Sequence, residues 1–161
     1  MDSHKVYLGC CLVILNPAGN RVLLAKRKVD PDKGGWQIPG GTVDCANGEN
    51  LEDAAVREAL EETGVTVESP AFLCLMNTFY YGKERPVHVA FVARATSDLI
   101  PLNPESHKAE DWFWADLKNL PEGKWFRMSR EAILFYTKSL TNSDASRFVL
   151  DADYPRATQK E

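Results

Sequence analysis

The chain has 161 residues, of which 44% are hydrophobic and 26% charged, and its 19 basic and 23 acidic side chains give a formal net charge of −4. This composition excludes collagen-like, disordered and membrane-spanning classes, and the length suits one domain that buries a core without disulfides or a structural metal. The negative charge also argues against a protein that binds duplex nucleic acid by neutralising its phosphates.

The β-rich runs at residues 5–15 and 22–25 flank the turn formers of NPAGNR, so we expect them to form a hairpin. The first run is too short to span a membrane, and we expect no membrane association. Residues 26–41 mix charge, proline and four glycines, which predicts a loop whose backbone approaches another group closely.

A helix is predicted from Leu51 to Thr63, because Asn50 can cap its start and Gly64 can adopt the left-handed conformation that ends helices. Residues 71–81 and 86–95 then predict a second hairpin, and residues 111–117 a short strand.

A second helix is expected from Arg130 to about Leu140, with Ser129 as its N-cap. Its apolar stripe consists of Ala132, Ile133, Phe135, Tyr136 and Leu140. Strands before, between and after two helices predict an α/β (α+β) fold in which helices pack on a mixed β-sheet. We assign the domain to residues 1–145 and treat residues 146–161 as a C-terminal tail, ordered only in part.

The cysteines show no spacing typical of a disulfide framework or a zinc site. They are Cys10, Cys11, Cys45 and Cys74. We expect them to be reduced, buried or half-buried, as in a cytoplasmic protein.

The predicted first helix carries three carboxylates on one side, because Glu58, Glu61 and Glu62 are spaced i, i+3 and i+4. Like charges at this spacing repel one another, and a bound cation would relieve the repulsion. Carboxylate oxygens select hard divalent cations, so the cluster predicts a site for Mg²⁺ or Mn²⁺.

The alternative is a charged surface helix in which Arg57 pairs with Glu61 and with Asp53. The glycine-rich turn WQIPGG lies just upstream and favours the metal site, because its backbone can approach the carboxylates closely.

The run from Gly48 to Val65 resembles the signature of the Nudix hydrolase family. It has Glu49, seven residues, Arg57-Glu58, two apolar residues, Glu61-Glu62, Thr63, Gly64 and an apolar residue. The family usually has five residues between the signature glycine and its first glutamate, whereas seven separate Gly41 from Glu49 here. We interpret the difference as a two-residue insertion around residues 44–47. The flanking LLAKRK and HKAEDWFWADLKNLP resemble the branch of the family that cleaves nucleoside triphosphates.

The resemblance implies a Nudix-type α/β/α sandwich that hydrolyses a nucleoside diphosphate linked to a further group, using Mg²⁺ or Mn²⁺. Its substrate would be a small-molecule nucleotide. The first candidate is a nucleoside triphosphate, natural or modified, which would be cleaved to the nucleoside monophosphate and pyrophosphate. A homodimer is one arrangement that the resemblance raises.

The resemblance also implies roles for individual residues. The implied metal ligands are Glu58, Glu61, Glu62 and the carbonyl oxygen of Gly40, and Arg57 and Glu49 would form a structural ion pair. Water activation would fall to Glu58, Glu61 or Glu110, with Asp111 as a second loop candidate.

Substrate contacts outside the signature follow less directly from the sequence. Arg27 is expected to contact phosphates, or else to face solvent at a strand end. Trp36, Phe79 and Tyr81 are candidates to stack on a base, although such side chains also pack in cores. We expect His88 to be packed or hydrogen-bonded.

Three alternatives to a triphosphate hydrolase stay open. Tyr81 follows the signature at a distance that resembles the dinucleoside polyphosphate hydrolases, and the longer loop before Glu49 would suit a nucleotide sugar. A third alternative is a nucleotide sensor without activity on the same fold.

Overall fold

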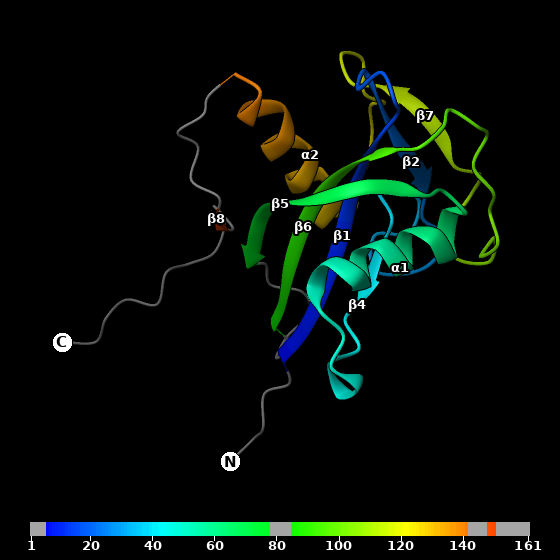
Figure 1. Ribbon diagram of the computed structural model, residues 1–161. Helices are drawn as coiled ribbons and strands as arrows, with labels where there is room; N and C mark the ends of the chain where they lie inside the picture. Colours follow the sequence, from blue (N-terminus) through cyan, green and yellow to red (C-terminus); the bar gives the residue numbers. More distant parts are fainter. Residues whose placement is uncertain (1–5, 78–84, 142–147, 151–161) are drawn as a thin grey trace.

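The computed structural model describes residues 6–77, 85–141 and 148–150 (Figure 1). The predicted base contacts Phe79 and Tyr81 lie outside the described residues, as does the predicted tail 146–161 apart from its strand at residues 148–150.

The predicted first hairpin is confirmed. Strands β1 (Val6–Leu15) and β2 (Arg21–Lys26) pair antiparallel. The buried side chain of Asn16 holds the turn, because its Oδ1 accepts hydrogen bonds of 3.0 Å from the backbone N–H groups of Asn20 and Arg21.

Residues 26–41, predicted as a loop, contain most of two short strands, so that prediction was wrong in part. Strand β3 (Trp36–Gln37) pairs with β2, and β4 (Gly40–Thr42) pairs with β1. Their partners lie far away in the sequence, so local propensity carried no signal for them.

Helix α1 (Leu51–Thr63) has the predicted bounds and caps. The Asn50 side chain accepts a hydrogen bond from the Asp53 N–H, and Gly64 is left-handed with a φ of 68°. The expected insertion forms a short 3₁₀ helix, η1 (Cys45–Asn47), with Asp44 as its N-cap.

The second predicted hairpin is formed by β5 (Val67–Asn77) and β6 (Arg85–Ala95), which pair antiparallel, and β5 starts earlier than predicted. Strand β6 also pairs parallel with β1, along the whole length of β1. Strand β7 (Phe113–Asp116) pairs with β2, and β8 (Phe148–Leu150) pairs parallel with β5. Over the described residues, these strands form a mixed eight-stranded sheet in which the order β3-β2-β1-β6-β5-β8 is extended by β4 and β7.

Helix α2 (Arg127–Ser139) begins three residues before the predicted start at Arg130. Ser129 is therefore not an N-cap but a buried residue of the first turn, where its Oγ accepts a 3.1 Å hydrogen bond from the Ile38 N–H. The Ser129 hydroxyl group, predicted from the sequence to cap the helix, is thus hydrogen-bonded to the backbone of a residue far away in the sequence. The predicted stripe also ends before Leu140, which is exposed.

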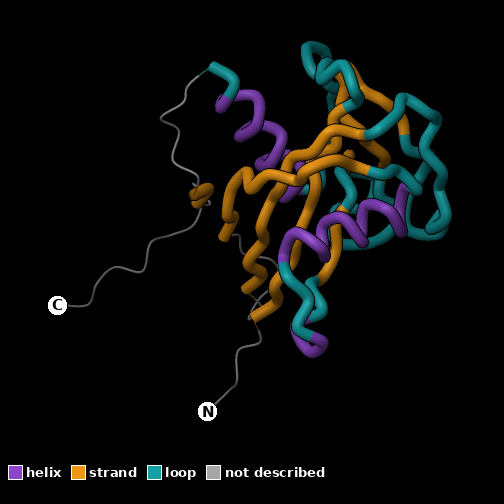
Figure 2. Tube along the Cα trace, viewed as in Figure 1, coloured by secondary structure: helices purple, strands orange, loops and turns teal. Residues whose placement is uncertain are grey.

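The two α-helices of the described residues cover opposite faces of the sheet (Figures 1 and 2). Side chains of β1 alternate between the faces: Cys10, Leu12 and Ile14 pack on the α1 side. Cys11 and Val13 pack on the α2 side. This α/β/α layering confirms the predicted fold.

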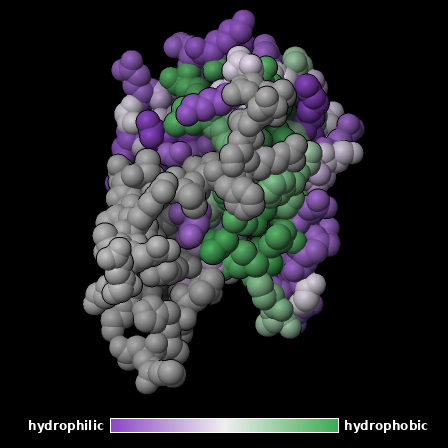
Figure 3. All heavy atoms as spheres, turned by 90° about the vertical axis from the view of Figure 1, so that its left-hand side faces the viewer, coloured by the Kyte–Doolittle hydropathy of each residue, from purple (hydrophilic) through white to green (hydrophobic). Residues whose placement is uncertain are grey.

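The face shown in Figure 3 combines hydrophilic regions with an apolar patch. In the described part of the chain, neither helix has the length and hydropathy needed to cross a membrane. All four cysteines are free, but Cys45 is exposed because it lies in the short helix η1, which contradicts the expectation that it is at least half-buried.

Candidate active site

Two of the three signature carboxylates of α1 face a small polar cleft. Glu58 and Glu62 line this cleft, which has a volume of about 270 Å³, together with Gly40, Gly41 and other residues. Glu62 is buried, and its Oε2 accepts a 3.1 Å hydrogen bond from the Gly40 N–H. We call this space the carboxylate cleft.

Gly41 is required by the position of Glu58. A Cβ atom on Gly41 would overlap the carboxylate of Glu58. The Pro-Gly-Gly turn therefore brings backbone directly against the carboxylates, as the sequence led us to expect.

The third carboxylate, Glu61, lies apart from the other two. Its side chain is 54% exposed, against 14% for Glu58, and its Oε2 lies 3.2 Å from Nη1 of Arg57. Within the described residues, no three acidic, histidine or cysteine side chains lie close enough together to enclose a metal ion. The oxygen donors suit a hard divalent cation, but Glu61 must turn away from Arg57 to join them.

Arg57 connects the helix to the loop before it. Its Nε lies 2.6 Å from Oε1 of Glu49, and its Nη2 donates to the Thr42 carbonyl oxygen at 3.2 Å. The hydrogen bond from Arg57 and a second from the Asp44 N–H lower the pKa of Glu49 to about 2. The structure thus contains the Arg57–Glu49 pair that the resemblance implied, and residues 44–47 are bonded to it through Asp44.

Burial changes the protonation of Glu62. Removal from water raises its pKa to about 7, with smaller contributions in the same direction from the negative charges of Glu58 and Glu105. The Gly40 N–H and Lys108 act in the opposite direction. In the absence of a cation, this carboxyl group is therefore partly protonated at neutral pH.

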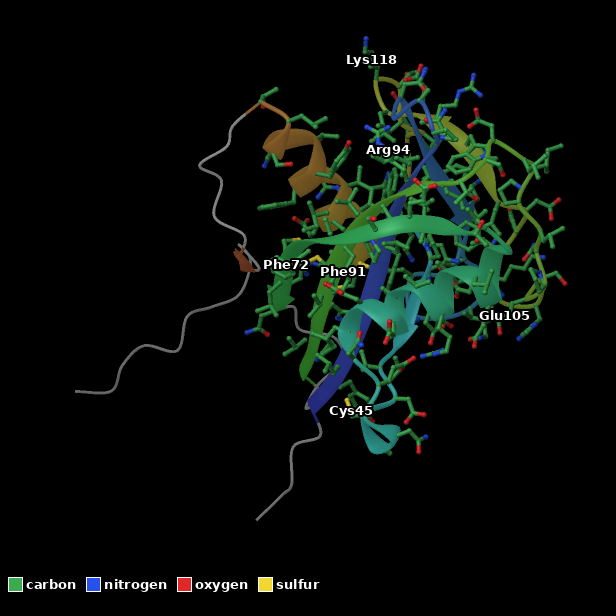
Figure 4. All side chains as sticks on the ribbon, viewed as in Figure 1. Cys45, Phe72, Phe91, Arg94, Glu105 and Lys118 are labelled. Carbon is green, nitrogen blue, oxygen red and sulfur yellow. The ribbon has the colours of Figure 1, made fainter. Side chains whose placement is uncertain are left out.

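The loop before β7 supplies a residue that the sequence did not single out. Lys108 lines the carboxylate cleft, and its Nζ lies 2.7 Å from Oε1 of Glu105. Figure 4 shows Glu105 near the C-terminal end of α1. The run SHKAED signalled only a charged loop, and nothing in it indicated which of its charges turns inward.

The acidic residues predicted in this loop lie elsewhere. Glu110 is exposed and does not line the cleft, and its backbone N–H donates to the Lys26 carbonyl oxygen at 2.8 Å. Asp111 is exposed and accepts a 3.3 Å hydrogen bond from the Asn103 side chain.

A second cavity, of about 340 Å³, adjoins the carboxylate cleft, and we call it the inner cavity. Its walls come from β1, β6, the start of α2 and the turn around β4. Four of its lining residues also line the carboxylate cleft: Arg27, Gly40, Gly41 and Thr42. The two spaces therefore adjoin along the glycine-rich turn.

Arg27 stands where the two spaces meet. Its Nη1 donates to Oε1 of Gln37 at 2.7 Å and its Nε to the Pro31 carbonyl oxygen at 2.9 Å. Its guanidinium group also lies 4.2 Å from the centre of the Phe126 ring. These contacts fix the guanidinium group at the boundary instead of leaving it in solvent.

Trp36, a candidate to stack on a base, lines neither of these two spaces. Its indole N–H donates to the Glu122 carbonyl oxygen at 2.9 Å, and its ring packs edge-on against Phe113. Trp36 instead fixes the segment before α2.

Comparison with known proteins agrees with this geometry. The NUDIX domain family model matches residues 7–134. An ADP-ribose pyrophosphatase from Methanocaldococcus jannaschii is 34% identical over 128 residues, which cover 76% of this chain and 71% of that protein. An RNA pyrophosphohydrolase from Pelagibacter ubique is 31% identical over 140 residues, with 76% and 86% covered.

Among solved structures, a MutT NUDIX hydrolase from Burkholderia pseudomallei is 32% identical with a TM-score of 0.71, covering 81% of this chain and 97% of that one. The matched family region includes the whole of α1 and both spaces described above. The chain therefore belongs to the Nudix family and is a pyrophosphohydrolase that acts on nucleoside diphosphates linked to a further group.

Proposed function

We propose that this enzyme hydrolyses a nucleoside triphosphate, natural or modified, to the nucleoside monophosphate and pyrophosphate. The observation that carries the proposal is that the carboxylate cleft and the inner cavity adjoin, with four lining residues in common. A polyphosphate in the cleft can continue into a nucleoside in the cavity, whose volume of about 340 Å³ falls in the range of small-molecule sites.

The proposed metal ligands are Glu58, Glu61, Glu62 and the Gly40 carbonyl oxygen. Bound Mg²⁺ or Mn²⁺ would supply neutralisation of phosphate oxygens and a lowered pKa for an attacking water. The all-oxygen donor set and the raised pKa of Glu62 support this assignment, because a buried carboxylate without a counter-ion is unfavourable. Arg57 forms ion pairs of 2.9 Å with Glu58 and 3.2 Å with Glu61, and so fixes the positions of these two side chains before a metal ion binds.

Other residues of the chain position the phosphates and accept the proton. Lys108 and Arg27 bring positive charge to the cleft, so we assign them contacts with phosphate oxygens. The proton acceptor is a carboxylate, either Glu58, Glu61 or the loop residue Glu110. The lining of the cleft favours Glu58 among them.

ADP-ribose is the second candidate substrate. It is favoured by the relative named ADP-ribose pyrophosphatase, which is 34% identical over 76% of this chain. Its ribose-phosphate end would leave the cleft on the side opposite the inner cavity. Because the four cysteines are free thiols, we also propose that the enzyme works in a reducing compartment such as the cytoplasm.

The test is hydrolysis of a panel of nucleoside triphosphates, ADP-ribose, nucleotide sugars and dinucleoside polyphosphates, with Mg²⁺ and with EDTA. We expect Mg²⁺-dependent release of pyrophosphate from at least one triphosphate and a loss of 100-fold or more, on the order of that for a lost catalytic group, in Glu61→Gln. Glu52→Gln, an exposed change in the first turn of the same helix, is the matched control and should retain activity. Hydrolysis of ADP-ribose alone would select the second candidate, and no hydrolysis of any compound would contradict the proposal.

A further inference from the structure

The inner cavity contains a histidine that the proposed chemistry does not use. His88 of β6 lies beside Gly9 of β1 in the parallel register, and both residues line the cavity. Along these strands, Cys11 and Ala90 pack on the α2 side of the sheet. Because side chains alternate along a strand, Gly9 and His88 belong to the same face, which the start of α2 covers.

Gly9 makes room for the imidazole ring. A Cβ atom at this position would lie 2.5 Å from Cδ2 and 2.6 Å from Nε2 of His88. No other residue type leaves this space, so the Nε2 edge of the ring rests over the backbone of β1 within the wall of the cavity.

The two ring nitrogens of His88 differ in their surroundings, since Nε2 lies beside Gly9 in the cavity wall. Nδ1 of His88 is buried and has no partner among the described residues. Burial lowers the pKa of His88 to about 4, so the imidazole is neutral at neutral pH and has one N–H and one lone pair. Buried N–H groups without a partner are rarer than unpaired acceptors, which favours the tautomer with its proton on Nε2.

Three neighbouring polar side chains of the cavity already have partners. Arg27 donates to Gln37 and Pro31, and Ser129 accepts from the Ile38 N–H. Cys10 donates through Sγ to the Gly41 carbonyl oxygen at 3.7 Å. His88 is therefore well suited to provide a new hydrogen bond to a molecule in this space.

We propose that His88 is a specificity-determining residue, whose Nε2–H donates to a carbonyl oxygen on the edge of the substrate's base. The inference rests on the proposed function, since it takes the inner cavity as the nucleoside site. The substrates are then nucleotides whose base has an oxo group at the position that the imidazole ring of His88 contacts. If the base had an amino group at this position, its N–H would face the imidazole N–H. Two donors cannot form a hydrogen bond, so both would be left unpaired.

Two pairs of nucleotides test this, because ITP differs from ATP, and UTP from CTP, by a carbonyl in place of an amino group, with an N–H in place of a lone pair on the adjacent ring nitrogen. We expect kcat/KM of the wild type to favour the oxo member of at least one pair by about tenfold or more. In His88→Phe, which keeps a ring but no hydrogen bond, the ratio should fall to within about twofold. Gly9→Ala should also reduce it by displacing the ring, while His107→Phe, an exposed change outside the cavity, should leave it unchanged.

Dissociation constants of the α,β-methylene analogues of the same nucleotides, measured by calorimetry with Mg²⁺, separate this inference from the proposed function. Oxo-selective binding that His88→Phe abolishes supports the inference even if no nucleotide is hydrolysed, in which case the proposed activity fails alone. Equal affinities of the wild type for both members of each pair overturn the inference, and this measurement needs no variant. A folded His88→Phe protein that keeps the preference overturns it as well.

Discussion

Glu62 is the signature carboxylate with the least access to water, and its energetics predict a pH-dependent stability of the metal-free protein. Folding raises its pKa from 4.5 to about 7, so the folded state binds the proton more tightly than the unfolded chain. The contribution of this group to stability is therefore complete below about pH 4.5 and is lost as the pH rises through about 7.

The variant Glu62→Gln keeps an acceptor for the Gly40 N–H but removes this titration. In EDTA at pH 8, we expect it to be more stable than the wild type by up to about 3 kcal/mol, since one pKa unit corresponds to about 1.4 kcal/mol. The difference should shrink towards zero at pH 5. Urea denaturation at both pH values measures it, and a variant that is less stable than the wild type at pH 8 would contradict the account.

The roles of single residues could be predicted from the sequence where their partners lie nearby along the chain, and not where the partners come from distant segments. The caps of α1 and the Arg57–Glu49 pair follow from spacing along the chain and from the family signature. The inward position of Lys108 and the packing of Trp36 against Phe113 depend on segments brought together by the fold, and no local pattern encodes them.

At the scale of elements, β4 places two adjacent glycines in different surroundings, which predicts different effects of the same substitution. A Cβ on Gly40 would meet backbone of β1, including Cα of Cys11 at 2.8 Å, whereas a Cβ on Gly41 would meet the end of the Glu58 side chain. We expect Gly40→Ala to cost about 1–3 kcal/mol of stability.

Gly41→Ala should instead leave stability within about 1 kcal/mol and lower kcat by about tenfold or more, because it displaces a proposed metal ligand. Denaturation curves and steady-state kinetics on the two proteins check the contrast. Equal losses of stability in both variants would be inconsistent with the described turn.

The start of α2 is tied to β3 and β4 through the buried hydrogen bond from the Ile38 N–H to Ser129. Ser129→Ala leaves this N–H buried without an acceptor, and we expect a loss of about 1–3 kcal/mol in unfolding free energy. Ser139→Ala, at the other end of the same helix, removes only a hydroxyl that donates to the Tyr136 carbonyl oxygen and should change stability by less than about 0.5 kcal/mol. Similar effects of the two changes would contradict a structural role for Ser129.

Elements with strong local signals were predicted closely, as α1 and the first hairpin show. The short strands β3 and β4 form by backbone pairing with β2 and β1, respectively. Helix α2 begins earlier than predicted, and its residue Ser129 accepts a hydrogen bond from the Ile38 N–H instead of capping the helix. These features arise from tertiary contacts, which override local propensity.

At the scale of the whole molecule, the fold brings the carboxylates of α1 beside a cavity that is lined in part by the start of α2. If the metal and the nucleotide bind in these adjoining spaces at the same time, the stabilisation by both should exceed the sum of the stabilisation by each alone. A ligand at 100 times its dissociation constant adds about 2.7 kcal/mol of stability. We expect the melting temperature to rise further with Mg²⁺ plus an α,β-methylene nucleotide than the sum of the rises with each alone, and a purely additive result would argue against a shared site.

The central claim is that the carboxylates of α1 bind divalent cations that hold a polyphosphate. Its most direct test is the anomalous scattering of Mn²⁺ in crystals grown with an α,β-methylene nucleotide. We predict peaks within about 2–2.5 Å of carboxylate oxygens of Glu58, Glu61 and Glu62, with Glu61 turned away from Arg57 and the phosphates on the same ions. Peaks elsewhere, or a nucleotide bound with Glu61 still paired to Arg57 and no ion beside it, would contradict the account.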